Sequence, residues 1–495
     1  MSRRAILLAA VLLVGCSGND DFDASRQIGP DPVLPEPSQS LWPDLRVATV
    51  VGWKEGETPE VPAGLAVTAY AKDLANPRTV HTLPNGDVLV MQSKAPEGKP
   101  LNRPKDIIRG WIMAMAAGGG GGGGGGETNR ITLLRDTNRD GAVDERQDIL
   151  ADLNSPFGVA WHDGTLYVAA ADAILAYAYE LGGGKITARP KILTPLPGGP
   201  INHHWTKDLA LSPDARFLFV SIGSNSNAGE RGIEAEKGRA AIWQVDRQTG
   251  AAKVFASGLR NPNGLNFHPQ TGELWTVVNE RDELGPDLVP DYLTSVKEGA
   301  FYGWPWSYYG QHVDPRVHPQ RPDMVERAIA PDYALSSHVA ALGLAFTNDS
   351  AMPEAFRDGA FVGNHGSWNR NAFNGYKVIF IPFADGRPSG AAQDVVTGFL
   401  NGDEARGRPV GLAMDGTGAL LIADDAGNTV WRVAAADGST TPQPLSTDRV
   451  SSSAMDEGTS ASPVEVKPEE ASPDDGSAMP AQTDVAPAVS SEDGQ

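Results

Sequence analysis

The feature that most constrains the fold is a short motif that recurs six times between residues 77 and 425. Each copy has a strand of alternating polar and apolar residues, a turn at Asp-Gly, Asn-Gly or a similar pair, and a second apolar strand, as in "PVGLAMDGTGALLIADD". A unit that cannot bury its apolar face alone must stack on neighbouring copies. The copies begin at Pro77, Pro156, Lys207, Pro262, Leu342 and Pro409.

Most copies are followed by a further pair of strands, such as "AAIWQVDRQTGAAKVFASG" at 240–258. Six units of four strands predict an all-β fold, a six-bladed β-propeller with four-stranded blades, over residues 46–436. A seven-bladed propeller is the alternative, with one blade hidden in residues 63–149. The spacing between copies varies, which indicates long loops between strands, and such loops build the binding site of a rigid scaffold.

The N-terminus is predicted to be a bacterial lipoprotein signal peptide, residues 1–15. A short basic region precedes the apolar run Ala5–Val14, which is too short to span a bilayer. The run ends in "LVGC", which is similar to a lipobox, so Cys16 is the predicted lipidation site; the chain has no other cysteine. By similarity to lipoprotein sorting rules, Ser17 favours the periplasmic face of the outer membrane. We therefore expect membrane contact only through the lipid anchor.

Two polar segments flank the predicted propeller. Residues 16–45 are rich in Pro and are predicted to be a flexible tether. Residues 437–495 contain twelve acidic and two basic side chains and no aromatic residue. Such a composition cannot bury a core, so a disordered acidic tail is predicted. The formal net charge of the whole chain is -21, which disfavours nucleic acid as a partner.

One loop has the spacing of a calcium-binding loop. Oxygen donors occupy its positions 1, 3, 5 and 9, and glycine occupies position 6, as in loops that wrap a hard cation. Its twelfth position lacks the glutamate of an EF-hand, so we expect a loop inserted between strands. A structural calcium site is predicted, with a solvated acidic turn as the alternative. The candidate ligands are Asp136, Asn138, Asp140 and Asp144.

Basic side chains fall at the equivalent end of several repeats. They are Arg260, Arg370, Arg406 and Arg408, where loops should converge on the propeller axis. Several guanidinium groups around one axis favour an anionic ligand, and unrelated surface arginines are the alternative. The pair His203–His204 precedes the third copy and is a polar loop edge unless the axis holds a site. The glycine run at 118–126 lacks the pattern of a phosphate-binding loop and is assigned no function.

These segments together resemble a known family, the soluble pyrroloquinoline quinone (PQQ)-dependent glucose/sorbosone dehydrogenases. The similarity covers roughly residues 65–433 and is closer to the L-sorbosone dehydrogenase-like branch. It implies a six-bladed propeller with PQQ and calcium as cofactors. The motifs that carry it are "INHHWTKDLALSPD", "GLRNPNGLNFHP", "NERDELGPDLVPDY", "GAFYGWPW", "FVGNHGSWNR" and "RGRPVG".

The resemblance implies a role for each matching residue. His204 would be the general base that removes the C1 hydroxyl proton of a sugar, which suits an imidazole near neutral pH. Arg260, next to Asn261, would hydrogen-bond the quinone oxygen and stabilise the charge that develops there. The remaining implied cofactor ligands are Arg406 and Arg408, with Arg370, or secondly Lys377, in place of a family lysine. Backbone carbonyls of Glu280, Arg281 and Asp282 would hold the calcium.

The sequence therefore predicts a quinoprotein oxidoreductase that oxidises an aldose or a sorbosone-like sugar at C1 by hydride transfer to PQQ. Electrons would pass to a respiratory acceptor, because no Cys-x-x-Cys-His haem motif is present. The bulk of Trp205 and Lys207 after the predicted base departs from the family's glucose enzyme and leaves the sugar open. The alternatives are a carbohydrate- or partner-binding propeller without activity, and a calcium-dependent lactonase, which would not need the arginines.

Overall fold

The computed structural model describes residues 22–39, 45–96, 127–347 and 350–440. Within these ranges the secondary structure is nearly all β, so the predicted all-β class is confirmed. The predicted signal peptide, Cys16, the glycine run and residues 441–495 of the predicted tail lie outside the described residues. Among the residues described, no helix is long and apolar enough to cross a membrane.

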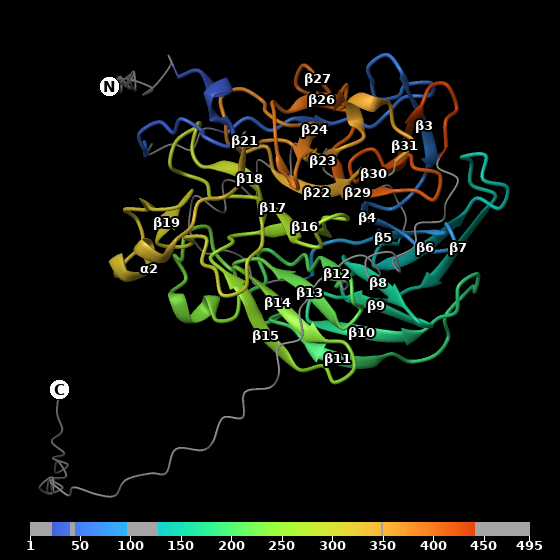
Figure 1. Cartoon of the computed structure of the whole chain (residues 1–495), viewed down its shortest axis with the longest axis horizontal. Coiled ribbons are helices and arrows are strands. Elements are labelled where there is room, and N and C mark those ends of the chain that lie inside the picture. The colour runs from blue at the N-terminus through green and yellow to red at the C-terminus, as the bar shows by residue number, and fades with distance from the viewer. Residues whose placement is uncertain (1–21, 40–44, 97–126, 348–349, 441–495) are drawn as a thin grey trace, which may run out of the picture. The chain divides into compact units, whose positions relative to one another are not determined.

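The six sequence repeats form six sheets of four or five strands in the described part of the chain (Figure 1). In each, the two strands of the repeat come first and the next strands follow outward. The first three sheets each have four strands. They comprise β4 (Pro77–Thr82), β5 (Val88–Gln92), β6 (Arg130–Arg135) and β7 (Glu145–Leu150); β8 (Val159–His162), β9 (Thr165–Ala169), β10 (Ala173–Ala178) and β11 (Lys191–Pro195); and β12 (Leu209–Leu211), β13 (Phe217–Ile222), β14 (Ala241–Asp246) and β15 (Ala252–Ser257).

The other three sheets recruit additional strands. The fourth repeat lies in a five-stranded sheet and the fifth lies in a sheet whose third strand pairs with two further strands, so a uniform count of four is not seen. They comprise β16 (Pro262–Phe267), β17 (Leu274–Val278), β18 (Pro290–Ser295), β21 (Tyr333–Ser337) and β1 (Ile28–Gly29); β22 (Ala341–Phe346), β23 (Gly359–Asn364), β24 (Lys377–Ala384), β25 (Arg387–Pro388) and β26 (Gln393–Val396); and β29 (Pro409–Met414), β30 (Leu420–Asp424), β31 (Thr429–Ala435) and β3 (Leu65–Ala71).

The first strands of successive sheets approach one another around a common axis, which is the arrangement of a β-propeller. The repeat's glycine permits this approach, because a Cβ at Gly158 would overlap the backbone of Leu209, and one at Gly411 would overlap Thr79. The second contact brings the last repeat against the first. Thr79 Oγ1 in turn donates to the carbonyl of Phe157 on the next sheet. A glycine in the repeat therefore sets the distance between neighbouring sheets.

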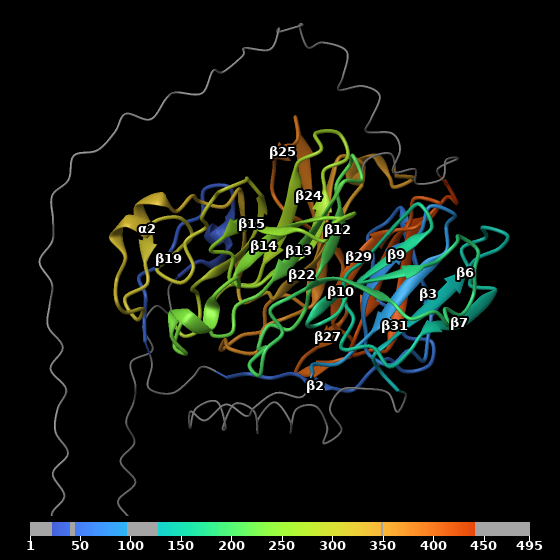
Figure 2. The ribbon, with the colours of Figure 1, turned by 90° about the horizontal axis from the view of Figure 1, so that it is seen from below.

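The N-terminal part of the described chain completes the sheet of the last repeat. β3 pairs antiparallel with β31, and the two strands lie side by side in Figures 1 and 2. The apolar side chains of β3 join a core cluster that spans the fifth and sixth repeats, with Leu65 packed in the same cluster as Met352 and Phe356. The two ends of the propeller are thus held in one sheet.

The predicted flexible tether is wrong for residues 22–39. The short helix η1 (Ala24–Gln27) and β1 pack on the fourth sheet, where Ile28 and Gly29 pair with Leu335 and Ala334 of β21. The side chain of Gln27 is fully buried. Pro-rich composition suggested a solvated segment, but two paired residues and one buried amide suffice to dock it. Further along, β2 (Thr49–Val50) pairs with β28 (Glu404–Ala405), which also pairs with β27 (Leu400–Asn401).

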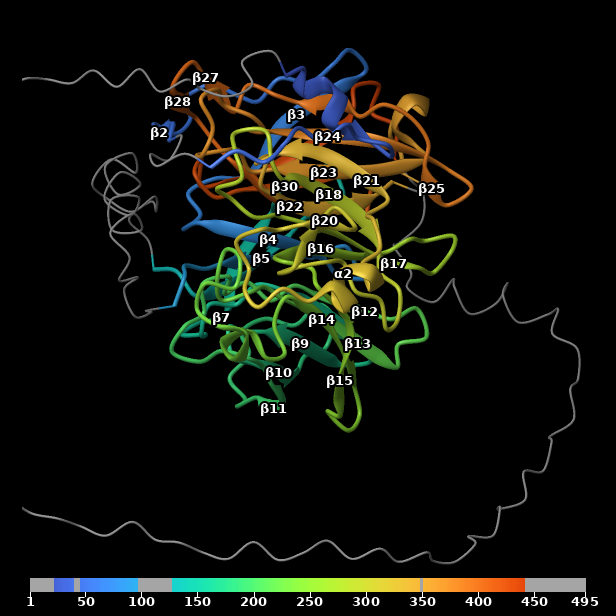
Figure 3. The ribbon, with the colours of Figure 1, turned by 90° about the vertical axis from the view of Figure 1, so that its left-hand side faces the viewer.

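The few remaining elements lie in loops. The helix α2 (Pro322–Arg327) and the hairpin β19 (Ser307–Tyr308) and β20 (His312–Val313) occupy one side of the unit, between β18 and β21 in sequence (Figures 1 and 3). The short helices η2 (Ile233–Glu236) and η3 (Glu354–Phe356) interrupt two other loops. Long loops at the start of the inner strands bring together the residues considered next.

Candidate functional site

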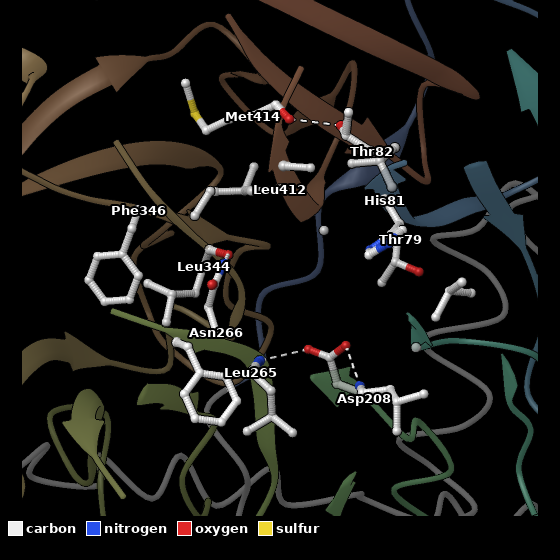
Figure 4. Close-up of a pocket in the computed structure, with 18 of the residues that line it drawn as sticks. Thr79, His81, Thr82, Asp208, Leu265, Asn266, Leu344, Phe346, Leu412 and Met414 are labelled. Carbon is white, nitrogen blue, oxygen red and sulfur yellow. Dashed lines mark hydrogen bonds between the residues drawn. The ribbon is translucent and has the colours of Figure 1, made fainter. Parts of the chain in front are cut away.

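The inner strands line one cavity, and the loops at their starting ends line a second. The larger, about 350 Å³, is lined by residues from all six first strands, and Figure 4 shows its wall. Asp208 projects into it and accepts hydrogen bonds from the backbone amides of Leu209 and Leu265 at 2.9 and 2.8 Å. Burial raises the pKa of Asp208 to about 6. None of the residues predicted from sequence lines this cavity.

The smaller cavity, about 230 Å³, lies where the inner strands begin, and it contains three of the predicted residues. His204 comes from the loop before β12, Arg260 from the loop before β16, and Asp282 from the loop after β17. The loops before and after the two inner strands of the fifth repeat complete the wall. The full lining is His203, His204, Arg260, Asn279, Asp282, His338, Ala340, Trp368 and Asn369.

The hydrogen bonds of His204 determine its tautomer. Nδ1 lies 2.8 Å from the backbone carbonyl of Ser224, which can only accept, so Nδ1 carries the proton. The Ser224 hydroxyl lies 3.0 Å from the same nitrogen and donates its own proton to the carbonyl of Ser226 at 2.6 Å. The lone pair therefore resides on Nε2. Burial first, and then the charges of Arg260 and His203, hold the pKa of His204 well below its usual range.

Arg260 is fixed by three hydrogen bonds. Its Nε donates to the carbonyl of Asn227 at 3.2 Å, Nη2 donates to the Asn227 side chain at 3.0 Å, and Nη1 donates to the carbonyl of Asn279 at 3.1 Å. Nη2 also lies 3.6 Å from Asp282 Oδ2. The residue is only 3% exposed, and burial lowers the pKa of its guanidinium. A fixed guanidinium beside an uncharged imidazole pairs an electrophilic group with a proton acceptor.

Asp282, His338 and Asn369, which also line this cavity, form a hydrogen-bonded trio. The amide of Asn369 donates to Asp282 Oδ1 and, at 3.1 Å, to Nδ1 of His338. Nε2 of His338 then donates to the carbonyl of Gly285 at 3.3 Å. The backbone beside the trio is strained, because Ser336, His338 and Ala340 all have positive φ angles, of 80°, 59° and 54°. Strain of this kind persists only where surrounding contacts over-determine the conformation.

Two buried basic side chains, Lys207 and Arg239, form hydrogen bonds to the loop that carries His203 and His204. Nζ of Lys207 donates to the carbonyls of Trp205 and His204, at 3.0 and 3.4 Å. Arg239 donates to the carbonyl of Gly223 at 3.0 Å and to the Asn202 side chain at 2.8 Å. Burial lowers the pKa of Arg239 to about 10 and that of Lys207 well below its usual range. Both residues position the loop by donating to oxygens in or beside it.

A second charged cluster surrounds His365, which follows β23. Its Nε2 lies 3.0 Å from both oxygens of Asp425, and Asp425 also forms an ion pair with Arg78. Arg408 donates to the carbonyls of His365 and Gly366 at 3.2 and 2.9 Å. Burial, followed by Arg408, lowers the pKa of His365 to about 4 despite the neighbouring carboxylate. The guanidinium of Arg78 lies 5.9 Å from the ring centre of Trp205, beside His204.

The other predicted cofactor ligands are dispersed. Asn261 is buried behind His204, and its Oδ1 has no hydrogen-bond partner. Arg370 is paired with Asp287 at 2.8 Å. Lys377, on β24, forms an ion pair with Asp394 on β26 at 2.7 Å, and the guanidinium of Arg406 lies 3.7 Å from the carboxylate of Glu57. The structure places Arg408 beside His365 and Asn261 close to His204. Lys377 and Arg406 instead lie beside carboxylates.

The predicted metal ligands also have protein partners. In the loop of Asp136, Asn138, Asp140 and Asp144, the carboxylates accept from the loop's own backbone amides, for example Gly141 to Asp136 Oδ2 at 2.8 Å. The guanidinium of Arg281 is fully buried against Glu280 and Asp314. The carbonyl of Asp282 accepts from Asn227 and Arg316. Across the described ranges no three His, Cys, Asp or Glu side chains are grouped closely enough to hold a metal ion.

Sequence reasoning missed His338, Trp368, Asn369 and Arg78. Two signals could have found the first three. His338 stands just before the fifth repeat, as His204 stands before the third, and Trp368 and Asn369 lie inside "FVGNHGSWNR", from which only the terminal arginine was selected. Arg78 lies within the first repeat's own strand, where a charged residue carries no distinguishing pattern.

The fold and this site together define a β-propeller with a polar cavity at the entry of its inner strands. The model of the TrAA12-like family matches residues 127–290 and 319–436, and the chain belongs to this family. A protein of Borreliella burgdorferi described as uncharacterized is 28% identical over 294 residues, which cover 57% of this chain and 76% of that protein.

Two further comparisons concern characterised relatives. A protein of Hypocrea jecorina named pyrroloquinoline quinone-dependent sugar dehydrogenase is 26% identical over 208 residues, covering 36% of this chain and 48% of that protein. The chain thus matches about half of that relative's length. The calcium structure of the Trichoderma reesei carbohydrate-active enzyme family AA12 superposes with a TM-score of 0.61 at 20% identity, covering 79% of this chain and 99% of that chain. The last comparison establishes a shared fold.

Proposed function

We propose that this protein is a PQQ-dependent oxidoreductase that oxidises a sugar at C1, with His204 as the general base. Family membership and the Hypocrea jecorina relative support the reaction class. The observation that carries the proposal is the tautomer of His204, whose unprotonated Nε2 belongs to a residue lining the cavity, with the fixed guanidinium of Arg260 in the same wall. We further propose that the six sheets are the six blades of the propeller.

The residues at this end of the propeller fit an anionic cofactor with polar ring substituents. Arg239 and Arg408 donate to carbonyl and amide oxygens and form no direct ion pair among the described residues, although the carboxylates of Glu236 and Asp425 lie near enough to interact with them. The buried Oδ1 of Asn261 is an acceptor without a donor. Arg260 and Arg408 would hold PQQ, a tricarboxylate, through charge-assisted hydrogen bonds, and Asn261 Oδ1 would accept a hydrogen bond from a donor on the cofactor. Arg78 and the ring of Trp205 would flank the same space.

The chain's own residues define the proton path. When bound, PQQ supplies a two-electron acceptor for the hydride that leaves C1 of the sugar. His204 Nε2 accepts the C1 hydroxyl proton as the C1–O bond gains double-bond character, so that hydride and proton leave the sugar together as two electrons and two protons in all. Ser224 keeps the Nδ1 proton in place and orients the ring. Arg260 stabilises negative charge on an oxygen near it, and Trp368 offers an apolar face to a sugar ring.

The remaining proposals concern the setting of the reaction. Calcium is proposed as a second cofactor because of the calcium structure of the similar fold. Electrons would leave to a respiratory acceptor, and lipidation of Cys16 would place the protein at the periplasmic face of the outer membrane. A panel of sorbosone, glucose and pentoses as substrates would identify the sugar class.

The test uses the full chain with PQQ and calcium, dye reduction as readout and the sugar panel as substrates. We expect saturable PQQ binding and sugar-dependent turnover, with His204→Gln losing about 100- to 10,000-fold in kcat while still binding PQQ. His162→Gln, on the distant strand β8, is the matched control and should retain full turnover. Absence of PQQ binding in the presence of calcium would refute the cofactor, and full turnover by His204→Gln would refute the base.

A further inference from the structure

We propose that Gln27, from the N-terminal segment, is a positioning residue for the trio of Asp282, His338 and Asn369. The proposal rests on the proposed function, because the trio forms one wall of the same cavity. Gln27 itself does not line the cavity and reaches the trio through other residues. No motif in the sequence indicates this role, since Gln27 lies in a polar stretch that composition assigns to a tether.

The amide of Gln27 joins two of the three segments that carry the trio, and Arg370 joins the third to them. Its Nε2 donates to the carbonyl of Asp287, at the end of the loop that begins near Asp282. Its Oε1 accepts from the hydroxyl of Ser337 at 2.9 Å, one residue before His338. Arg370, next to Asn369, completes the connection by pairing with Asp287 at 2.8 Å and donating to the carbonyl of Ser337 at 3.4 Å.

Three observations indicate that these bonds position the wall. Gln27 is fully buried, and a buried amide that loses its partners cannot replace them with water, so its bonds resist rearrangement. The segment it holds contains the strained residues Ser336, His338 and Ala340, which require contacts on both sides to keep their conformation. The same N-terminal segment contacts the loop again at Ser38, whose amide donates to the carbonyl of Leu284 at 2.9 Å.

The consequence is geometric. Asp282 lies 3.6 Å from Arg260, and Asn369 fixes both Asp282 and His338. A shift of the loop by a fraction of an ångström would change the position of the trio relative to Arg260 and His204, which line the same cavity. Displacements of this size in positioning groups lower turnover without removing any catalytic atom.

The test uses Gln27→Met, which keeps the side-chain length and apolar contacts but removes both hydrogen bonds, and Gln27→Ala as the truncated form. Gln39→Ala, an exposed glutamine in the same segment, is the matched control. We expect Gln27→Met to lower kcat/KM for the sugar by about 10- to 100-fold. In the apo protein we expect faster amide hydrogen exchange confined to residues 279–290 and 333–341, with thermal unfolding still cooperative. Gln39→Ala should change neither quantity.

The outcomes separate this inference from the proposed function. If the wild-type chain shows no PQQ-dependent turnover, the proposed function fails, and the exchange measurement alone decides whether Gln27 holds the wall. If the wild type is active and Gln27→Met matches it in both exchange and kcat/KM, the positioning role is refuted. A loss seen in Gln27→Ala but not in Gln27→Met would show that the side chain only fills space, which also refutes it.

Discussion

At the scale of single residues, burial and the neighbouring Arg260 determine the protonation state of His204. Desolvation first, and then the buried guanidinium, disfavour a positive charge on the imidazole and lower its pKa, so His204 stays neutral near pH 7. A neutral imidazole with Nδ1 bonded to Ser224 can act at Nε2 as a base. The arrangement therefore separates proton acceptance from charge stabilisation within one cavity wall.

The lowered pKa of His204 sets the expected pH dependence. A base must be unprotonated, and its pKa lies well below 6.5 in the folded protein, so activity should persist as pH falls through 6.5 and decline only below it. A pH profile of kcat/KM for the free enzyme measures this directly. His203→Gln removes one of the charges that lower the pKa and should move the acid limb to slightly higher pH. An acid limb centred at or above 6.5 in the wild type would contradict the assignment.

Gly223 tests the packing behind the same base. A Cβ at this position would overlap both the Cβ of His204 and Oδ1 of Asn261, so a methyl group must displace one of them. We expect Gly223→Ala to lower kcat by about 10- to 100-fold through misplacement of the imidazole. Gly199→Ala, in the loop that leads to the histidines, has no atom near its added Cβ and is the control. Equal turnover of the two variants would show that the imidazole's position tolerates the shift.

The sequence identified His204 and Arg260 because each stands directly before a repeat, and the repeat defines one end of the inner strands. It did not identify the trio, because the partnership of Asp282, His338 and Asn369 depends on loops from the fourth and fifth repeats that meet only in the folded molecule. The charge and position of Lys377 and Arg406 in the sequence do not reveal that each lies beside a carboxylate, Asp394 and Glu57 respectively. Residue type and repeat position predict location, whereas pairing requires the structure.

At the scale of elements, the inner two strands of every sheet were predictable and the closing strand was not. The repeats give alternating patterns and turns that mark the inner strands. β3 follows no repeat, and its partner β31 lies more than 350 residues away in sequence. The docking of β1 could not be predicted from the sequence either. It depends on backbone pairing of two residues with β21, and so short a strand has almost no side-chain pattern.

Substitution of Leu65 tests how much β3, the closing strand, contributes to the free energy of unfolding. Leu65 is 7% exposed at the start of β3 and packs in the cluster that joins the fifth and sixth sheets. We expect Leu65→Ala to lower the free energy of unfolding by about 2–5 kcal/mol in urea titration. Val254→Ala, on the exposed strand β15, should stay within about 0.5 kcal/mol of the wild type. A wild-type value for Leu65→Ala would mean that closure by β3 adds little stability.

At the scale of the whole molecule, the N-terminal segment connects the candidate site to the predicted anchor. Residues 22–39 pack on the fourth sheet, and the amide of Ser38 donates to the carbonyl of Leu284. Further along, the backbone amide of Arg46 donates to the carbonyl of Trp368 at 3.1 Å. The segment therefore passes beside two loops of the cavity. Cys16 precedes Asp23, the cap of η1, by seven residues, which span at most about 25 Å. A lipid on Cys16 would hold this side of the propeller within that distance of a membrane.

Lipidation of Cys16 is tested by expressing the full chain in a bacterium that processes lipoproteins. We expect the wild type in the membrane fraction, with a mass increase from the lipid on its N-terminal peptide, and Cys16→Ser in the soluble fraction. Ser17→Ala leaves the cysteine intact and should remain with the membrane.

Inserting about 20 Gly/Ser residues after Ser17 lengthens the tether without touching the docked segment. If the short tether serves to keep the site near a membrane acceptor, the insertion should lower oxygen uptake by membranes with sugar as donor while dye-linked turnover stays constant. Membrane association of Cys16→Ser equal to the wild type would contradict the anchor.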